Sequence, residues 1–251
     1  MKHMTEIGLL FRRKLLELLR EPVWIVSEFS MPVLYLALFA PLLKGLQSSA
    51  LGGNVLNTFV PGLLTLFAFS SGIGEAWTIV NELQTGVTER FRVSPASRFS
   101  LLMGSVLRDT LIFLASALLL ISISCLFGFT ASLPGLVILL LLLCLLTATI
   151  SATAVSIGLL LKTSGSVAAL ITTLQLPITL LSGVLLPITI GPMWLQVIAH
   201  FNPLFYLVEA SRVLTAGSIL NVTVLEAAAI MVPLTAFVLW WATRVYRKVV
   251  A

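Results

Sequence analysis

Two apolar stretches, "LASALLLISISCLFGF" at residues 114–129 and "GLVILLLLLCLLTATI" at residues 135–150, establish the class of this chain. Both are hydrophobic on every side, whereas a membrane-barrel strand alternates apolar and polar residues over about ten positions. A helix needs about 20 apolar residues to cross roughly 30 Å of hydrocarbon. With their flanks, the two stretches are therefore predicted to be transmembrane helices.

The composition of the whole chain agrees with this prediction. Of its 251 residues, 59% are hydrophobic and 10% are charged, which is more apolar surface than a soluble core of this length can bury. The apolar runs and their breaks predict six spans, at about 24–43, 57–80, 106–128, 134–160, 167–187 and 223–243. The expected fold class is an all-α integral membrane protein.

The distribution of basic residues predicts the orientation. If the N-terminus is cytoplasmic, thirteen of the fifteen lysines and arginines lie inside, and only Lys44 and Arg212 lie outside. We expect a multi-pass protein of the cytoplasmic (inner) membrane of a prokaryote, with both termini cytoplasmic. The net charge of +5 then follows from topology, so no nucleic-acid partner is expected.

The segment before the first span is amphipathic. Ile7, Phe11, Leu15 and Leu18 share one helical face, and the charged side chains Arg12, Arg13, Glu17 and Arg20 lie on or near the other. We predict an interfacial helix over residues 4–21 that lies on the inner surface of the lipid bilayer.

One extended polar run, "NELQTGVTERFRVSPASRFS" at residues 81–100, separates the second and third spans. Gly86 permits a turn, "VTERFRV" predicts a brief amphipathic helix, and Ser94-Pro95 is a helix-start signal. The run carries charges of both signs, which suits docking to a protein surface.

The segment at 188–222 is too apolar for an ordinary external loop. Asn202-Pro203 divides it, because a residue before proline is pushed out of helical geometry. Two short external helices are predicted, which either form an interfacial aromatic belt or dip into the membrane and return.

No catalytic set, metal motif or Walker A loop occurs in the sequence, so neither an enzyme nor an ATP-binding chain is predicted. The ionisable residues noted in the spans, Glu75 and Glu226, lie near opposite interfaces, where each either reaches headgroup water or has a coupling role. Because no buried charge pair is predicted, an ion-coupled secondary transporter is disfavoured.

Three stretches resemble the ABC-2 class of ATP-binding-cassette export permeases, which includes daunorubicin-resistance and nodulation-factor exporters. They are "FVPGLL" at 59–64, "NELQTGVTERFRVSPASRFSLLMG" at 81–104 and "LLPITIGPMWLQVIAHFNPLFYLVEASR" at 185–212. The third stretch has its Pro, Trp-Leu, Asn-Pro-Leu, Tyr and Arg in the order of the family's C-terminal signature. The resemblance covers nearly the whole chain.

The resemblance implies a single transmembrane domain over residues 1–251. It implies the permease subunit of an exporter for an amphipathic drug-like or lipid-like compound, paired with a second permease copy or a close relative. Two copies of a separate cytoplasmic ATPase would bind ATP and Mg, and this chain would hold no cofactor. The alternatives are export of a lipid-linked or capsular polysaccharide, and ion-coupled secondary transport.

The resemblance also assigns roles to residues. Contacts with the ATPase are expected from Glu82, Thr85, Gly86, Thr88, Glu89, Arg90, Arg92 and Lys162. Spans two and five are expected to face the substrate path, with Ser70, Ser71, Glu75, Thr172, Gln175 and Thr179 along it, and spans one and five to meet the second permease. The external helices carry Trp194, Asn202, Pro203, Tyr206 and Arg212.

Overall fold

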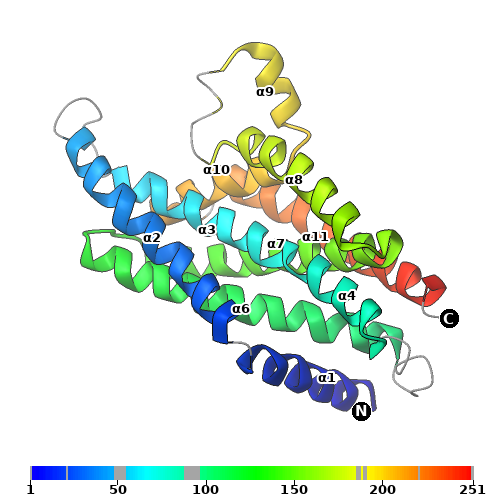
Figure 1. Ribbon diagram of the computed structural model, residues 1–251. Helices are drawn as coiled ribbons and strands as arrows, with labels where there is room; N and C mark the ends of the chain where they lie inside the picture. The colour runs from blue at the N-terminus through cyan, green and yellow to red at the C-terminus, as the bar shows by residue number, and fades with distance from the viewer. Residues whose placement is uncertain are drawn as a thin grey trace.

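The computed structural model describes residues 2–20, 22–47, 55–87, 97–184, 188, 191–219 and 221–249, and these residues are almost entirely α-helical. No strand occurs in this part of the chain, which confirms the predicted all-α class. The helices are α1 (Lys2–Leu19), α2 (Pro22–Gln47), α3 (Val55–Ile73), α4 (Glu75–Gln84), α6 (Arg98–Leu126), α7 (Leu133–Leu161), α8 (Ser164–Leu181), α9 (Met193–Ala199), α10 (Pro203–Thr215) and α11 (Val222–Val249) (Figure 1).

Five described segments are long and apolar enough to cross a membrane: Phe59–Gln84, Arg98–Leu126, Leu133–Leu161, Ser164–Leu181 and Val222–Val249. They coincide with the second to sixth predicted spans. The first predicted span lies in α2, whose apolar segment Ile25–Phe39 is shorter than the other five. A multi-pass membrane protein is therefore supported, while the count of six stays a prediction.

The second predicted span consists of two helices, α3 and α4, that meet at Gly74. Gly74 keeps nearly helical angles, with φ −53° and ψ −30°, so the two helices follow one another almost without a break. The junction places Glu75 in the first turn of α4, at the level of the polar site described below.

Helix α7 is the centre of the bundle, and α3, α4, α6, α10 and α11 pack around it (Figure 1). Glycines bring the neighbouring backbones close. A Cβ atom at Gly72 would lie 2.8 Å from Ile150 Cβ, and one at Gly158 would lie 2.2 Å from Ile79 Cγ2. Small residues at such crossings allow helices in lipid to gain van der Waals contact.

The apolar core of the bundle has two main parts. The larger cluster includes Leu63, Phe113, Leu143, Leu207 and Met231. The second cluster joins α4, α6, α7 and α11 through Ile79, Leu102, Val155, Leu159 and Tyr246, with Leu10 of α1 packed against it. Because Tyr246 near the end of α11 meets the first turns of α6 here, both chain ends lie at the same end of the bundle, at the lower right of Figure 1.

Two peripheral features match predictions from the sequence. The N-terminal helix is present as α1, which packs along α6 and keeps Arg12, Glu17 and Arg20 exposed. The segment after span five is divided at Asn202-Pro203 into α9 and α10. Most of α10 is buried against α3, α7 and α11, which favours the interpretation that it dips into the bundle, whereas α9 is exposed.

Helix α8 lies at the edge of the bundle. Val167 is its buried residue, and Leu170, Leu174, Leu176 and Leu180 are exposed. This apolar face therefore has no cover from the described part of the same chain.

Candidate functional site

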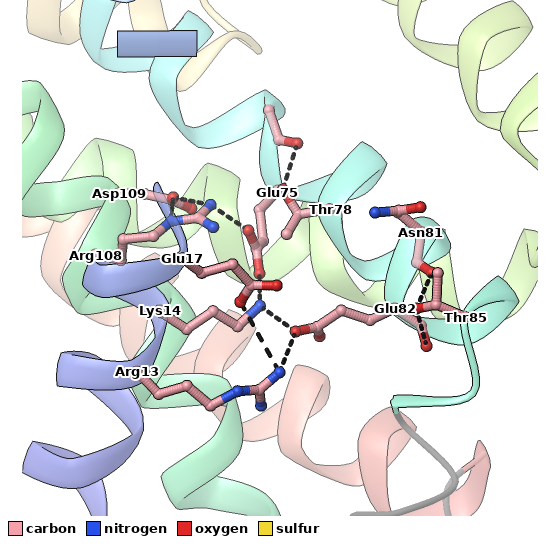
Figure 2. A network of polar contacts seen from close by, with 11 residues as sticks. Arg13, Lys14, Glu17, Glu75, Thr78, Asn81, Glu82, Thr85, Arg108 and Asp109 are labelled. Carbon is pink, nitrogen blue, oxygen red and sulfur yellow. Dashed lines mark hydrogen bonds and ion pairs between the residues drawn. The ribbon is translucent and has the colours of Figure 1, made fainter. Parts of the chain in front are cut away.

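Charged side chains from α1, α4 and α6 meet inside the bundle, toward the end that holds the two chain termini (Figure 2). Lys14 of α1 lies between two carboxylates of α4: its Nζ is 3.2 Å from Glu75 Oε1 and 3.0 Å from Glu82 Oε1. Arg13 Nη2 is 3.5 Å from the same Glu82 oxygen. These contacts of Glu82 are ion pairs by distance and lack the angles of aligned hydrogen bonds.

The other end of this network belongs to α6 and α7. Arg108 Nη2 donates to Glu75 Oε2, and to Asp109 Oδ1 at 2.6 Å. The Ser151 hydroxyl of α7 donates to Asp109 Oδ2. We call the six charged residues Arg13, Lys14, Glu75, Glu82, Arg108 and Asp109 the charge network. Its positive and negative groups alternate from α1 through α4 to α6.

All members of the charge network except Arg13, whose side chain is 36% exposed, are removed from water. Glu75 is 0% exposed, Asp109 1% and Arg108 8%, while Lys14 and Glu82 are also buried. An unpaired charge at one of these buried positions would cost on the order of several kcal/mol of folding free energy. Each of these groups therefore depends on its partners. Burial by itself lowers the pKa of Lys14, but the carboxylates of Glu75 and Glu82 outweigh it and raise this pKa above its usual value. Lys14 is therefore positively charged at neutral pH.

Helix α1 makes a second contact, at the first turn of α6. Glu6 Oε2 accepts hydrogen bonds from Ser97 N at 3.4 Å and from Ser100 Oγ at 3.3 Å. Ser97 is the N-cap of α6, and its hydroxyl accepts from Ser100 N at 3.0 Å. Residues 88–96 lie between Glu82 and Ser97 in the chain. Helix α1 is therefore bonded to the chain on both sides of that segment.

The predicted contacts with an ATPase fall only in part within the described residues. Thr88, Glu89, Arg90, Arg92 and the helix start at Ser94-Pro95 lie outside them. Thr85 is exposed at the end of α4, and Gly86 makes the expected turn with φ +72°. Glu82 faces α1. Lys162 is exposed at the sharp turn between α7 and α8, with left-handed φ of 58°.

The residues of the predicted substrate path are not brought together. Ser70 and Ser71 line a cavity beside the charge network, next to Arg108 and Asp109. The predicted path residues of α8, Thr172, Gln175 and Thr179, do not line this cavity. The hydroxyl of Thr172 donates to Ala168 O, and the hydroxyl of Thr179 donates to Gln175 O. In α8 the hydroxyls thus satisfy their own helix instead of bonding to a neighbour.

The interpretation that Glu75 reaches headgroup water is wrong. Its carboxylate does not reach headgroup water, because it is fully buried between Lys14 and Arg108. The expected lack of buried charge pairs is also wrong, and with it the sequence-based argument against an ion-coupled carrier. Glu226 is exposed, as expected.

Two of the predicted residues of the external helices, Asn202 and Arg212, anchor α10. Asn202 caps α10 by accepting from Leu204 N at 3.1 Å, and its Nδ2 donates to Ile178 O of α8 at 2.8 Å. Arg212 Nη2 donates to Gly183 O at 2.7 Å. The remaining predicted residues also belong here: Pro203 is the first residue of α10, Tyr206 OH donates to His200 O, and Trp194 is exposed on α9. These contacts hold α10 against the end of α8.

Sequence reasoning missed Lys14, Arg108 and Asp109, although each left a signal. Lys14 stands at helical spacing between Phe11 and Leu18, on the apolar stripe of its helix. Arg108-Asp109 is an ionisable pair near the start of an apolar helix, and such groups in a span usually have partners inside the protein. The orientation argument counts Arg108 only as one of the basic residues on the cytoplasmic side.

Comparisons with known proteins place this chain in a family. Residues 5–215 match the family described as ABC-2 type transporter. The putative transport permease ycf38 of Cyanophora paradoxa is 30% identical over 219 residues, which are 85% of this chain and 75% of the relative. That of Porphyra purpurea is 27% identical over 223 residues, which are 87% and 76% of the two chains.

A fourth comparison links the chain to a drug-resistance protein. The daunorubicin resistance ABC transporter permease protein DrrB1 of Streptomyces coeruleorubidus is 24% identical over 199 residues, covering 78% of this chain and 70% of that protein. The resemblance drawn from the sequence is confirmed, and membership of the family implies association with an ABC ATPase. The chain belongs to the ABC-2 type transporter family, as a transport subunit of the membrane and not an enzyme.

Proposed function

We infer that this chain is the permease subunit of an ATP-driven exporter that moves an amphipathic drug-like or lipid-like compound across the cytoplasmic membrane of a prokaryote. A separate ATPase in two copies binds ATP and Mg, and a second permease, identical or closely related, completes the pathway. The family match supports this proposal, as does the sequence, which contains no Walker A motif of its own.

The observation that carries the proposal is the attachment of α1 on both sides of residues 88–96. Glu82 on one side meets Arg13 and Lys14, and Ser97 on the other side donates to Glu6. A partner that binds the polar segment and shifts it therefore pulls on α1, α4 and α6 together. Such a segment is where force from an ATPase enters the permease.

The charge network then carries the displacement into the bundle. Lys14 is shared by Glu82 and Glu75, and Glu75 in turn contacts Arg108. Because unpaired charges are costly at this depth, the helices move as a group from one paired arrangement to another. ATP binding selects between two such arrangements, since an effector acts only through its different affinity for two states.

The remaining parts of the assembly follow the charge distribution and the exposed surfaces. Both termini lie on the cytoplasmic side, where the basic residues gather. The exposed apolar faces of α8 and α2 meet the second permease, and lipid covers the rest of the spans.

Affinity purification in mild detergent from the native host tests the proposal. A polypeptide with a Walker A motif should co-purify, and reversal of the adjacent charges (Glu89→Lys with Arg90→Glu) should reduce its recovery or uncouple its hydrolysis from transport. Glu226→Lys, a reversal at an exposed position of α11, is the matched control and should retain the ATPase. Transport without any co-purifying ATPase would favour an ion-coupled carrier, for which the buried charge pairs supply a basis.

A further inference from the structure

A cavity of about 280 Å³ opens beside the charge network, between α1, α2, the α3–α4 junction and α6. Its apolar wall consists of Leu18, Ile25, Phe29, Trp77 and Ile112. Charged side chains face it from three helices: Glu17 of α1, Glu28 of α2, and Arg108 with Asp109 of α6. Figure 2 shows Glu17, Thr78, Asn81, Arg108 and Asp109 of this lining.

The cavity has an excess of negative charge. Arg108 and Asp109 belong to the charge network, which contains three cations and three carboxylates and is balanced by itself. The carboxylates of Glu28 and Glu17 do not belong to this balanced set and add negative charge to the cavity. Among the described residues Glu28 forms no ion pair and is hydrogen-bonded to the Ser71 hydroxyl, and Glu17 has only a 3.9 Å contact with Arg13. Arg108, which already pairs with Glu75 and Asp109, offsets the charge of Glu28 only in part, so this partly dehydrated carboxylate is stabilised further when a cation enters.

The shape and lining indicate which cation fits. A bare metal ion needs several clustered oxygen, nitrogen or sulfur ligands, and no group of three or more His, Cys, Asp or Glu residues suited to a metal occurs in the described chain. Phe29 and Trp77 instead offer aromatic surface, which attracts organic cations through the charge distribution of the rings. Ligand pockets combine such apolar walls with a few convergent polar groups.

We propose that this cavity binds an organic cation with apolar substituents, and that Glu28 is its principal counter-charge. Phe29 and Trp77 contact the apolar groups of the ligand, and Glu17 lies at the exposed rim, where water screens its contribution. The site deepens the proposed function, on which it rests, because it names the class of amphipathic compound that the permease takes up.

The test uses two probes of equal shape and opposite charge, tetraphenylphosphonium and tetraphenylborate. The purified protein with its partner subunits is placed in lipid nanodiscs without ATP, and binding is measured by equilibrium dialysis. We expect one saturable site per chain for the phosphonium cation and no saturable binding of the borate anion at this site. Equal binding of the two ions would overturn the proposal.

Variants locate the site. Glu28→Gln should weaken phosphonium binding about tenfold, because one charged contact of a little over 1 kcal/mol is lost. Glu17→Gln should weaken it less, and Glu226→Gln, the same change at an exposed position of α11, should leave it unchanged. Ile112→Phe fills the cavity without changing any charge and should reduce binding even if Glu28→Gln folds poorly. Unchanged affinity in both Glu28→Gln and Ile112→Phe would reject the site.

The outcomes separate this inference from the proposed function. If an ATPase co-purifies but the phosphonium cation does not bind, the cation site is rejected and the permease assignment stands. If the cation binds in the predicted manner while no ATPase is associated, the site is supported and the ATP-driven mechanism is rejected.

Discussion

At the scale of single residues, Arg108 connects the parts of the site. It contacts Glu75 of α4 and its own neighbour Asp109, and Asp109 accepts from Ser151 of α7. Guanidinium suits this position because its donors lie in a fixed fork and can serve two carboxylates at once. Without it, Glu75 would keep Lys14 and the Ser105 hydroxyl as partners, and Asp109 would keep the Ser151 hydroxyl.

Arg108→Met should therefore destabilise the protein strongly. Removal of one partner from a buried ion pair leaves an uncompensated charge and costs about 3–5 kcal/mol. The midpoint of thermal unfolding in detergent should fall by several degrees, and Arg108→Lys should lie between the variant and the wild type. Arg12→Met, on the exposed side of α1, is the control and should keep the wild-type midpoint. A wild-type midpoint for Arg108→Met would mean that the network does not stabilise the fold.

At the scale of elements, the contact of α3 and α4 with α7 sets the geometry of the site. At Gly72 an added Cβ would lie 2.8 Å from Ile150 Cβ and 2.9 Å from Ser151 N and Thr147 O. These atoms belong to the helix itself and cannot rotate away. The same contact fixes Ser151, which donates to Asp109, so helix spacing and charge pairing depend on each other.

Gly72→Ala should destabilise the bundle although alanine favours helices. Replacement of a helical glycine normally gains up to about 1 kcal/mol, but overpacking here should cost about 1–3 kcal/mol. Gly165→Ala is the matched control, since nothing lies within 4 Å of the added Cβ at the start of α8. Thermal unfolding of the two variants should show a loss for Gly72→Ala only, and equal midpoints would contradict the tight contact.

At the scale of the whole molecule, the two ends of the bundle differ. The end with both termini carries α1, the end of α4 and the charge network, whereas α9 lies at the far side of Figure 1. The sharp turn at Lys162 and the cap at Asn202 reverse the chain between these ends. This polarity is what a permease needs if energy enters from one side and the compound leaves on the other.

Cysteine labelling tests the orientation. In a protein whose Cys125 and Cys144 are replaced by alanine, Thr85→Cys should react with a membrane-impermeant maleimide only from the cytoplasmic side. Met193→Cys, at an 80% exposed position of α9, should react only from the outside. Labelling of both positions from the same side would overturn the topology, and the reverse pattern would place the termini outside.

Local patterns in the sequence were sufficient for the elements. Hydropathy and run length predicted the five long spans, Asn202-Pro203 predicted the division between α9 and α10, and the apolar stripe of residues 4–21 predicted α1. Each of these features depends on neighbours within one helix, so a single chain read in order contains the necessary information. The three stretches that resemble the ABC-2 class likewise indicated the family, which comparison confirmed.

The partners of the charged residues were decided only by the tertiary structure. Glu75 pairs with residues 33 and 61 positions away, on helices whose relative depth and rotation no local pattern contains. The sequence therefore showed the carboxylate of Glu75 but not its burial, and it placed Arg108 on the cytoplasmic side without a partner. The cavity beside Glu28 likewise could not be predicted from the sequence, because its walls form only when four segments pack together. Sequence by itself determined that this chain crosses a membrane and belongs to a transporter family; packing determined where its charges meet, because pairing in a low-dielectric interior depends on distances between helices.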